Sequence, residues 1–239
     1  MNTIWEGIKQ AFLLLFSGNK EIYEIVLLTI KVSGIAVIIS IIAGLPVGLI
    51  IGLNDFKGKR FLVSLINTGM GLPPVAAGLL VAVFLWRSGP LGFLSLMYTP
   101  TAMIIAQVLI AVPIIAGVTL AAIQQVNPKL KTQAISLGAN KWQTIWIMAK
   151  EAKLPVLAAV MAGFGGVISE VGAVMMVGGN IKGMTRVLTT ATVQSVRMGN
   201  IAMAIALVII LLIISFAVNF TLTMIQQKEN KIWFQRFLK

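Results

Sequence analysis

The chain has 239 residues, of which 58% are hydrophobic and 11% are charged, with a formal net charge of +12. A soluble domain carries about 25% charged residues, so this composition excludes a soluble globular domain and indicates a membrane protein. The basic residues lie in short segments between apolar runs, which favours membrane orientation over nucleic-acid binding. The sequence contains no cysteine and no histidine, which excludes disulfides, thiolate metal sites and histidine proton relays.

The N-terminal segment 1–20 is predicted to be an interfacial helix. Its apolar residues recur at roughly helical spacing, at Ile4, Trp5, Ile8, Phe12, Leu15 and Phe16. The clean apolar stretch is too short to cross a bilayer, although a sixth span is the alternative. Glu6 and Lys9 lie inside it and no small-residue cleavage site follows, so it does not resemble a cleavable signal.

Five charge-poor apolar runs predict membrane-spanning helices, because each is long enough to cross the hydrocarbon core. They cover about residues 30–53, 61–86, 100–123, 154–177 and 201–225. We therefore expect an all-α, polytopic membrane protein that forms a single transmembrane domain over residues 1–239.

The first of these runs carries a stripe of small residues. Gly44, Gly48 and Gly52 recur every fourth residue, a spacing that lets two helix backbones approach closely. Pro46 in this run and the Pro73–Pro74 pair in the second predict kinks. Ordinary helix packing is the interpretation favoured for these residues.

The orientation follows from the basic residues in alternate connections. Of the 19 Lys and Arg residues, twelve lie in connections on one side, six lie on the other, and Lys31 lies at the end of a span. Since cytoplasmic loops carry the excess of Lys and Arg, we expect the N-terminus outside and the C-terminus in the cytoplasm. The segment 124–153 is then cytoplasmic, and the segment 178–200 is extracytoplasmic.

The segment 124–153 is too polar to span the membrane and too amphipathic for a plain loop. Pro128 suits a helix start, Gly138 is expected to break that helix, and Asn140 is expected to cap a second one. Apolar side chains follow on the second helix, at Trp142, Ile145, Trp146 and Met148. Two short helices bent at a glycine could insert into a cleft of another protein or lie on the membrane, and these residues leave both alternatives open.

The same segment contains Thr132-Gln133-Ala134, then Gly138 after three residues, then Leu154-Pro155. This pattern is similar to the cytoplasmic loop of bacterial ABC-importer permeases. Thr132 stands in place of the family's Glu, Gln133 in place of its first Ala, and Lys150-Glu151 in place of its Leu-Pro. The resemblance implies a coupling helix that inserts into an ATP-binding subunit. Its expected residues are Thr132, Gln133, Ala134, Leu137, Gly138 and Ala139.

Two further stretches resemble the permeases of molybdate, sulfate and tungstate importers. One comprises residues 67–78 and 86–92, and the other comprises residues 166–173 and 177–191. The residues in these stretches are most similar to those of the tungstate permease subunit. The similarity extends from about Ile22 to Phe220. The resemblance implies the type I ABC importer permease fold and the import of a tetrahedral oxyanion. Tungstate is the first expectation, and molybdate and sulfate are alternatives.

The resemblance also implies the partners of the chain. We expect a second copy of the chain, two cytoplasmic ABC ATPase subunits, an extracytoplasmic oxyanion-binding protein and the lipid bilayer of a prokaryotic cytoplasmic membrane. ATP and Mg²⁺ would be held by the ATPase, and no cofactor is expected in this chain. Residues 178–185 nearly match a P-loop, but Met184 replaces its lysine. The chain is therefore not expected to be an enzyme by itself.

Candidate residues for the ion pathway lie in the second run and in the outer connection. They are Asn67, Thr68, Glu170, Asn180, Lys182, Thr185, Arg186 and Thr189. The outer cations and hydroxyls could receive a dianion, or their loop could dock the binding protein. Glu170 is a carboxylate inside a predicted span, for which a structural role competes with a gating role. An ATP-independent channel or carrier is the rival class, and the lack of other membrane carboxylates weighs against a proton-coupled one.

Overall fold

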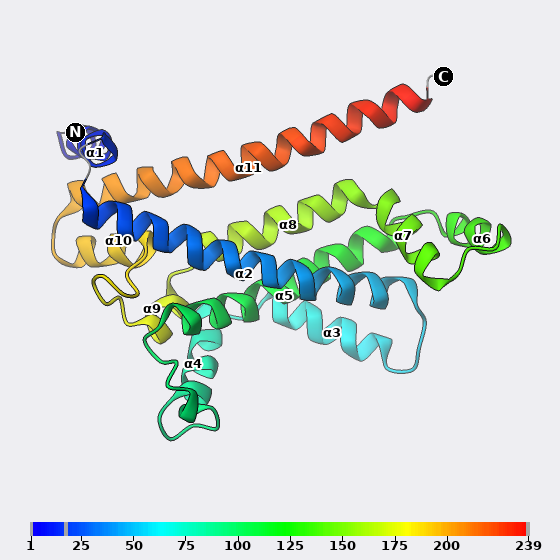
Figure 1. The fold of residues 1–239 in the computed structure, drawn as a ribbon, viewed down its shortest axis with the longest axis horizontal. Coiled ribbons are helices and arrows are strands. Elements are labelled where there is room, and N and C mark those ends of the chain that lie inside the picture. Colours follow the sequence, from blue (N-terminus) through cyan, green and yellow to red (C-terminus); the bar gives the residue numbers. More distant parts are fainter. Residues whose placement is uncertain (1, 17–18, 238–239) are drawn as a thin grey trace. The chain divides into compact units, whose positions relative to one another are not determined.

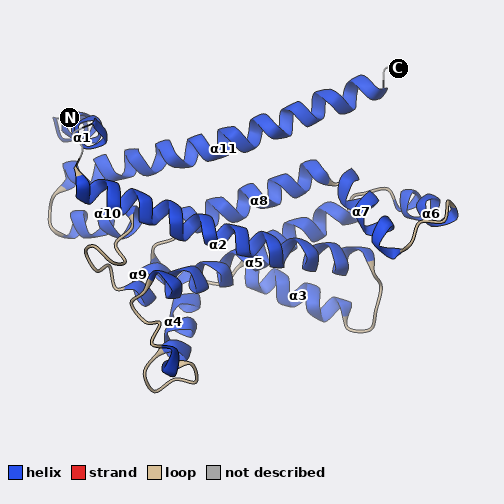
Figure 2. Ribbon diagram, in the orientation of Figure 1, coloured by secondary structure: helices blue, strands red, loops and turns tan. Residues whose placement is uncertain are grey.

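The computed structural model describes residues 2–16 and 19–237, with side chains over residues 4–14 and 19–227. All regular structure in this part of the chain is helical (Figure 2). The helices, labelled in Figure 1, are α1 (Asn2–Phe16), α2 (Lys20–Leu53), α3 (Lys59–Met70), α4 (Pro74–Leu85), the 3-10 helix η1 (Gly92–Leu94), α5 (Pro100–Gln124), α6 (Pro128–Ser136), α7 (Lys141–Glu151), α8 (Lys153–Ile168), α9 (Gly172–Gly178), α10 (Leu188–Arg197) and α11 (Ile201–Phe237).

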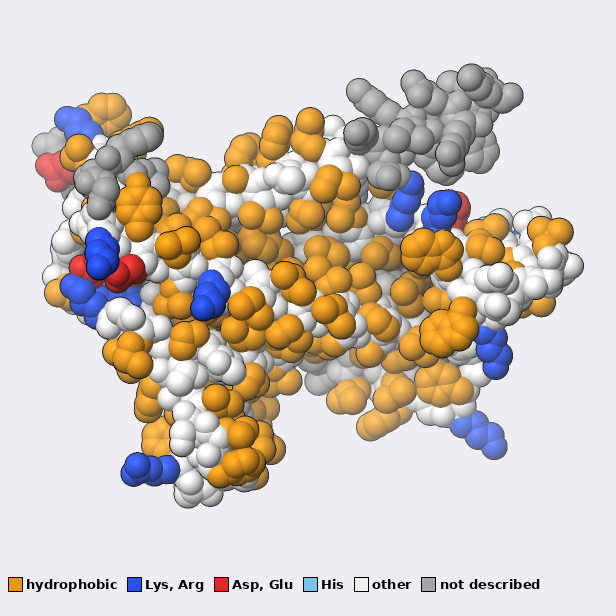
Figure 3. Space-filling model, viewed as in Figure 1, with side chains coloured by type: hydrophobic (Ala, Val, Ile, Leu, Met, Phe, Trp, Pro, Cys, Tyr) orange, Lys and Arg blue, Asp and Glu red, His pale blue; other side chains and the backbone are white. Residues whose placement is uncertain are grey.

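Three described helices are long and apolar enough to cross a membrane, namely α2, α5 and residues Ile201–Gln227 of α11. The number rises to five if the pair α3 and α4 and the pair α7 and α8 each count as one bent span. The expected all-α polytopic membrane fold is therefore confirmed. Hydrophobic side chains cover much of the face in Figure 3, which suits contact with lipid.

Two of the expected spans are not continuous helices. The run 61–86 is divided between α3, which ends at Met70, and α4, which begins at Pro74. A proline suits the first position of a helix, where its missing N–H costs no helical hydrogen bond. The run 154–177 is divided between α8 and α9, with residues 169–171 between them. Helix α2 also begins ten residues before the expected start at residue 30. Residues 1, 17–18 and 238–239 lie outside the described part of the chain, as do the side chains of the last four basic residues used in the orientation count.

The chain forms two compact units. Unit 1 comprises Met1–Ala36, Pro73–Leu109 and Gly165–Val218, and unit 2 comprises Val37–Leu72, Ile110–Phe164 and Asn219–Lys239. The expectation of a single domain over 1–239 stays a prediction.

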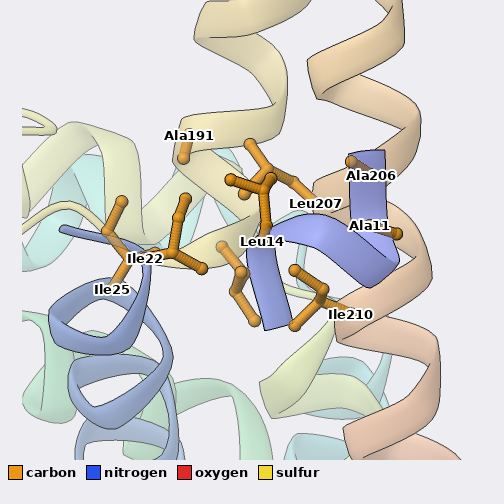
Figure 4. Close-up of a cluster of buried hydrophobic side chains, with 9 residues drawn as sticks. Ala11, Leu14, Ile22, Ile25, Ala191, Ala206, Leu207 and Ile210 are labelled. Atoms are coloured by element: carbon orange, nitrogen blue, oxygen red, sulfur yellow. The ribbon is translucent and has the colours of Figure 1, made fainter. Parts of the chain in front are cut away.

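The core of unit 1 contains side chains from both the first and the last segment of that unit (Figure 4). The cluster consists of Ala11, Leu14, Ile22, Ile25, Leu188, Ala191, Ala206, Leu207 and Ile210. Helix α1 lies so close to α11 that a Cβ on Gly7 would come within 2.5 Å of Ile205 Cγ2. Its other side exposes Ile4, Trp5, Phe12 and Leu13. The interfacial position of this helix stays a prediction.

Unit 2 is built around the glycine stripe. A Cβ on Gly44 would come within 3.0 Å of Val112 O, and one on Gly48 within 2.5 Å of Ala116 O. A Cβ on Gly52 would come within 2.9 Å of Ile123 Cγ2. The stripe therefore lets α2 and α5 pack backbone to backbone, which confirms the packing interpretation.

Candidate functional site

The 124–153 segment forms two helices joined by a rigid bend. Helix α6 ends at Ser136, and the chain then turns at Gly138, whose φ of 86° lies in the left-handed region that favours glycine. Asn140 then caps α7 in a capping box, because its side chain accepts from Gln143 N at 2.9 Å and its N–H donates to Gln143 Oε1 at 2.8 Å. The expected bend and the expected cap are both confirmed. Asn127 also caps α6 by accepting from Lys129 N, a contact that the sequence analysis missed.

One side of this pair of helices is anchored in unit 2. Thr144 and Met148 are buried, and Met148 packs against Leu53 and Ile123. Lys131 Nζ donates to the carbonyl of Leu53, at the end of α2. These contacts hold the bend to the rest of the unit.

The opposite side of the pair is apolar and exposed. Leu137 is 89% exposed, Trp142 is 78% exposed and Trp146 is 71% exposed. We call these three residues the exposed apolar knob. Among the expected coupling residues, Thr132, Gln133 and Gly138 are exposed, Ala139 is half-buried, and Ala134 is buried and accepts a hydrogen bond from Ala139 N at 3.0 Å. Large exposed side chains on a rigid support are typical of a protein interface.

Asn67 and Thr68 lie together in an open groove of unit 2. The groove has a volume of about 730 Å³ and is lined by Lys59, Arg60, Val63, Ser64, Asn67, Thr68 and Gln124. Six of these residues recur at i, i+4 and i+8 spacing along α3, so they share one helix face. Lys59, Arg60, Ser64 and Gln124 were not predicted as neighbours of the two candidates. The spacing on α3 could have indicated Lys59, Arg60 and Ser64, whereas Gln124 comes from the end of α5.

The hydroxyls of the outer connection are used within the protein. Thr185 is fully buried, and its Oγ1 donates to Gly178 O at 2.6 Å and accepts from Ile181 N at 2.9 Å. Thr189 Oγ1 donates to Glu170 O at 3.0 Å. Asn180 adopts a φ of 52°, and its Nδ2 donates to Gln194 Oε1 at 2.8 Å. In this conformation these groups shape the loop and are not open to a passing ion.

Glu170 lies in the break between α8 and α9 and is buried. Its Oε1 accepts from Ala173 N at 2.7 Å, at the start of α9. A carboxylate that receives backbone N–H groups at a helix start stabilises that start. The backbone hydrogen bond expected for a structural role is present, and whether Glu170 also acts in gating stays a prediction.

Lys182 and Arg186, in the loop between α9 and α10, lie against a carboxylate of α2. Glu21, in the first turn of α2, has Oε2 at 2.7 Å from Lys182 Nζ and Oε1 at 3.6 Å from Arg186 Nη1. Lys182 is 66% exposed in its side chain, whereas Arg186 is 18% exposed. The sequence analysis did not identify Glu21, since nothing in its local sequence indicates a partner so far along the chain.

Comparisons with known proteins identify the family. Residues 44–231 match the family described as the inner membrane component of binding-protein-dependent transport systems. The chain is 42% identical over 228 residues to a tungstate uptake system permease protein, TupB, of Peptoclostridium acidaminophilum, which covers 95% of this chain and all of the relative. It is 41% identical to a probable anion ABC transporter permease protein of Haloferax volcanii, over 82% of this chain and 87% of the relative.

Solved structures support the same fold. A bacterial ABC transporter that imports the acidic polysaccharide alginate matches with a TM-score of 0.76 at 18% identity, over 92% of this chain and 83% of that one. An amino acid ABC transporter matches with a TM-score of 0.66, over 91% of this chain and 98% of that one. The expected importer permease fold and the expectation that the chain is no enzyme by itself are confirmed. The chain therefore belongs to the family of inner membrane components of binding-protein-dependent transport systems, and is a non-catalytic permease subunit of an ABC importer.

Proposed function

We propose that this permease imports tungstate. The support is the full-length similarity to the permease of a tungstate uptake system, at 42% identity. A second tungstate permease protein, from Campylobacter jejuni, is 33% identical over 92% of this chain. Relatives named for molybdenum and sulfate transport are less similar, at 24% to 29% identity. Molybdate and sulfate remain the alternatives, because the three ions share tetrahedral shape and double negative charge.

The exposed apolar knob is the observation that carries the coupling mechanism. We infer that it inserts into a cleft of a cytoplasmic ATPase subunit, which holds ATP and Mg²⁺. Leu137, Trp142 and Trp146 offer apolar area, while Gly138 and the Asn140 capping box fix their geometry. A rigid support transmits a movement of the ATPase to α8, which follows α7 after a bend of 75°. Thr132 and Gln133 would lie at the rim of this contact, where polar residues are usual.

The functional unit would be a pair of these permeases with two ATPases and an extracytoplasmic binding protein. In this arrangement the N-terminus lies outside and the C-terminus lies in the cytoplasm, as the distribution of basic residues favours. The α3 groove then opens toward the cytoplasm. Its cations Lys59 and Arg60 would draw the anion inward past the polar groups of Asn67 and Thr68.

Transport by reconstituted vesicles tests this proposal. The chain is assembled with its ATPase and loaded with binding protein outside, and uptake of labelled tungstate is measured with ATP and with a non-hydrolysable analogue inside. We expect uptake only with ATP, and competition by unlabelled tungstate at lower concentrations than by molybdate or sulfate. Uptake that does not require nucleotide would refute the coupled mechanism and favour a channel or carrier. Stronger competition by molybdate or sulfate would reassign the ion.

A further inference from the structure

A small pocket in unit 1 lies where the outer loop meets the start of α2. It has a volume of about 280 Å³, and its charged lining residues are Glu21, Glu24, Lys31, Lys182 and Arg186. Ile25, Leu27, Leu28, Gly183 and Met184 complete the lining. Three cations and two carboxylates give the lining a formal charge of +1. The pocket is large enough for a tetrahedral oxyanion and is bounded partly by apolar side chains, which strengthen electrostatic attraction inside it.

Arg186 is incompletely satisfied in this pocket. Its Nη1 lies 3.6 Å from Glu21 Oε1, and its Nη2 lies 3.5 Å from Asn180 O. Both distances are long for charged hydrogen bonds, which are usually about 2.7–2.9 Å. Its Nε is buried with no hydrogen-bond partner among the described residues. A guanidinium has five N–H donors, so a largely buried one with such weak contacts indicates a place for a further anionic oxygen.

Glu21 occupies the position that such an anion would take. Its carboxylate has one oxygen toward Lys182 and one toward Arg186, as an oxyanion between the two cations would. Glu21 belongs to α2, whereas the cations belong to the loop. The Glu21 side chain can therefore move away from the cations while the hydrogen bonds within the loop remain. A dianion carries twice the charge of a carboxylate and is therefore attracted more strongly by the same cations.

We propose that this pocket is a low-affinity subsite for a tetrahedral oxyanion, and that Glu21 is an internal competitor for its cations. The subsite rests on the proposed import function and would receive the ion on the extracytoplasmic side. Intramolecular competition keeps the affinity low, because Glu21 belongs to the same folded unit and must be displaced before an ion can contact both cations. Weak binding suits a position that the ion must leave again during transport.

Equilibrium binding of labelled tungstate tests the subsite. The full chain with its ATPase is placed in lipid nanodiscs without binding protein, and the dissociation constant is measured by flow dialysis. We expect Glu21→Gln to raise the affinity about tenfold, since it removes one competing charge contact. Lys182→Met and Arg186→Met should each lower the affinity at least about fivefold, also in the Glu21→Gln background.

Two variants separate competition from other effects. Glu6→Gln removes one negative charge from α1 of the same unit without touching the pocket lining, and should leave the dissociation constant unchanged. Glu21→Asp keeps the charge but shortens the side chain, so it should raise the affinity by a smaller factor than Glu21→Gln. Equal effects of Glu6→Gln and Glu21→Gln would overturn the proposal, as would a fall in affinity in both Glu21 variants.

The outcome is distinguishable from failure of the import function. If ATP-dependent tungstate uptake is present but neither Glu21 nor the two cations affect binding, only the subsite is refuted. If the Glu21 variants instead tighten the association of the binding protein and leave ion binding unchanged, the cations serve protein docking and the subsite is also refuted.

Discussion

The two connections 178–187 and 124–153 use their side chains in opposite ways. In the outer loop, Thr185 and Asn180 are bonded within the loop and its surroundings, and Lys182 and Arg186 face Glu21. In the 124–153 segment, the capping groups are satisfied, while the three side chains of the exposed apolar knob are little covered by the rest of the chain. The outer loop is shaped by its own polar groups, whereas the other segment has a surface that a partner would complete. Polar composition alone does not distinguish these two situations.

The largest expected effect comes from removing the exposed apolar knob. The double substitution Leu137→Ser and Trp142→Ser should lower ATP-dependent uptake about 30-fold or more, since central apolar anchors of an interface are worth 2 kcal/mol or more. The melting temperature of the isolated chain should not fall, because both side chains are exposed. Uptake and co-purification of the ATPase are the measurements.

Trp5→Ser is the matched control for this double variant. It removes an indole that is 60% exposed from α1, in unit 1. It should leave co-purification of the ATPase intact. If the ATPase failed to co-purify with both variants, the loss of binding could not be attributed to the exposed apolar knob.

A second, smaller effect is expected from the bend itself. Gly138→Val forces a branched side chain into a left-handed conformation, which costs about 1–2 kcal/mol, and should lower uptake about tenfold by shifting the knob. Gly58 has a φ of 93° and equally open surroundings, at the start of α3. Gly58→Val therefore carries similar strain outside the coupling segment, and should retain most of the uptake. Equal losses in the two variants would attribute the effect to strain and not to coupling.

In the outer loop, the expected effect is on stability. Thr185→Val leaves the Gly178 carbonyl and the Ile181 N–H without their hydroxyl partner, at a cost of about 1–3 kcal/mol. Thermal unfolding of the purified chain should show a lower melting temperature, with Thr185→Ser restoring most of it. Thr132→Val, at an exposed position of α6, should leave the melting temperature unchanged. An unchanged melting temperature for Thr185→Val would show that the loop is not held by this hydroxyl.

The smallest effect is expected at the pair of the exposed Asp55 and the half-buried Lys59, whose Oδ1 and Nζ lie 2.9 Å apart. The hydrogen bond from Lys59 lowers the pKa of Asp55 below its ordinary value. A lowered pKa means that the stabilisation is present above the unfolded-state pKa and is lost as the pH falls through the folded-state pKa. The melting temperature of Asp55→Asn should therefore be slightly below that of the wild type at neutral pH, and the two should be equal in strong acid. A clear difference in melting temperature that persists in acid would contradict this assignment.

Much of the fold could be predicted from the sequence because membrane spans, helix caps and glycine stripes are local patterns. Gly138 and Asn140 are examples, since a left-handed φ and a capping box depend on a few neighbouring residues. The break after Met70 was harder to place. The pair Pro73 and Pro74 predicts a kink, whereas the structure has a break between Met70 and Pro74. Helix α4 packs on α9, where a Cβ on Gly78 would come within 2.6 Å of Ala173 Cα, and this contact between distant parts of the sequence leaves no local pattern.

The candidate site was predicted less well, because its contacts join residues that are far apart in the sequence. The sequence indicates that Thr185, Lys182 and Arg186 can bind anions, but it does not reveal which groups they already contact. Glu21 reaches Lys182 from a helix at the other end of the sequence, and no periodicity or motif connects the two. Whether these residues meet the ion depends on such contacts, which only the three-dimensional arrangement provides.

The buried hydroxyl of Thr29 has a consequence for how the protein is made. It accepts a hydrogen bond from Leu188 N at 2.9 Å, across a separation of 159 residues, and donates to Ile25 O at 2.7 Å. The first turn of α10 therefore receives a partner from a helix that leaves the ribosome long before it. Since contacts of large sequence separation form late, the outer part of unit 1 should complete its structure only after most of the chain has been synthesised. In a nascent chain that stops before α10, the Thr29 hydroxyl would lack the hydrogen bond that it accepts from Leu188 N.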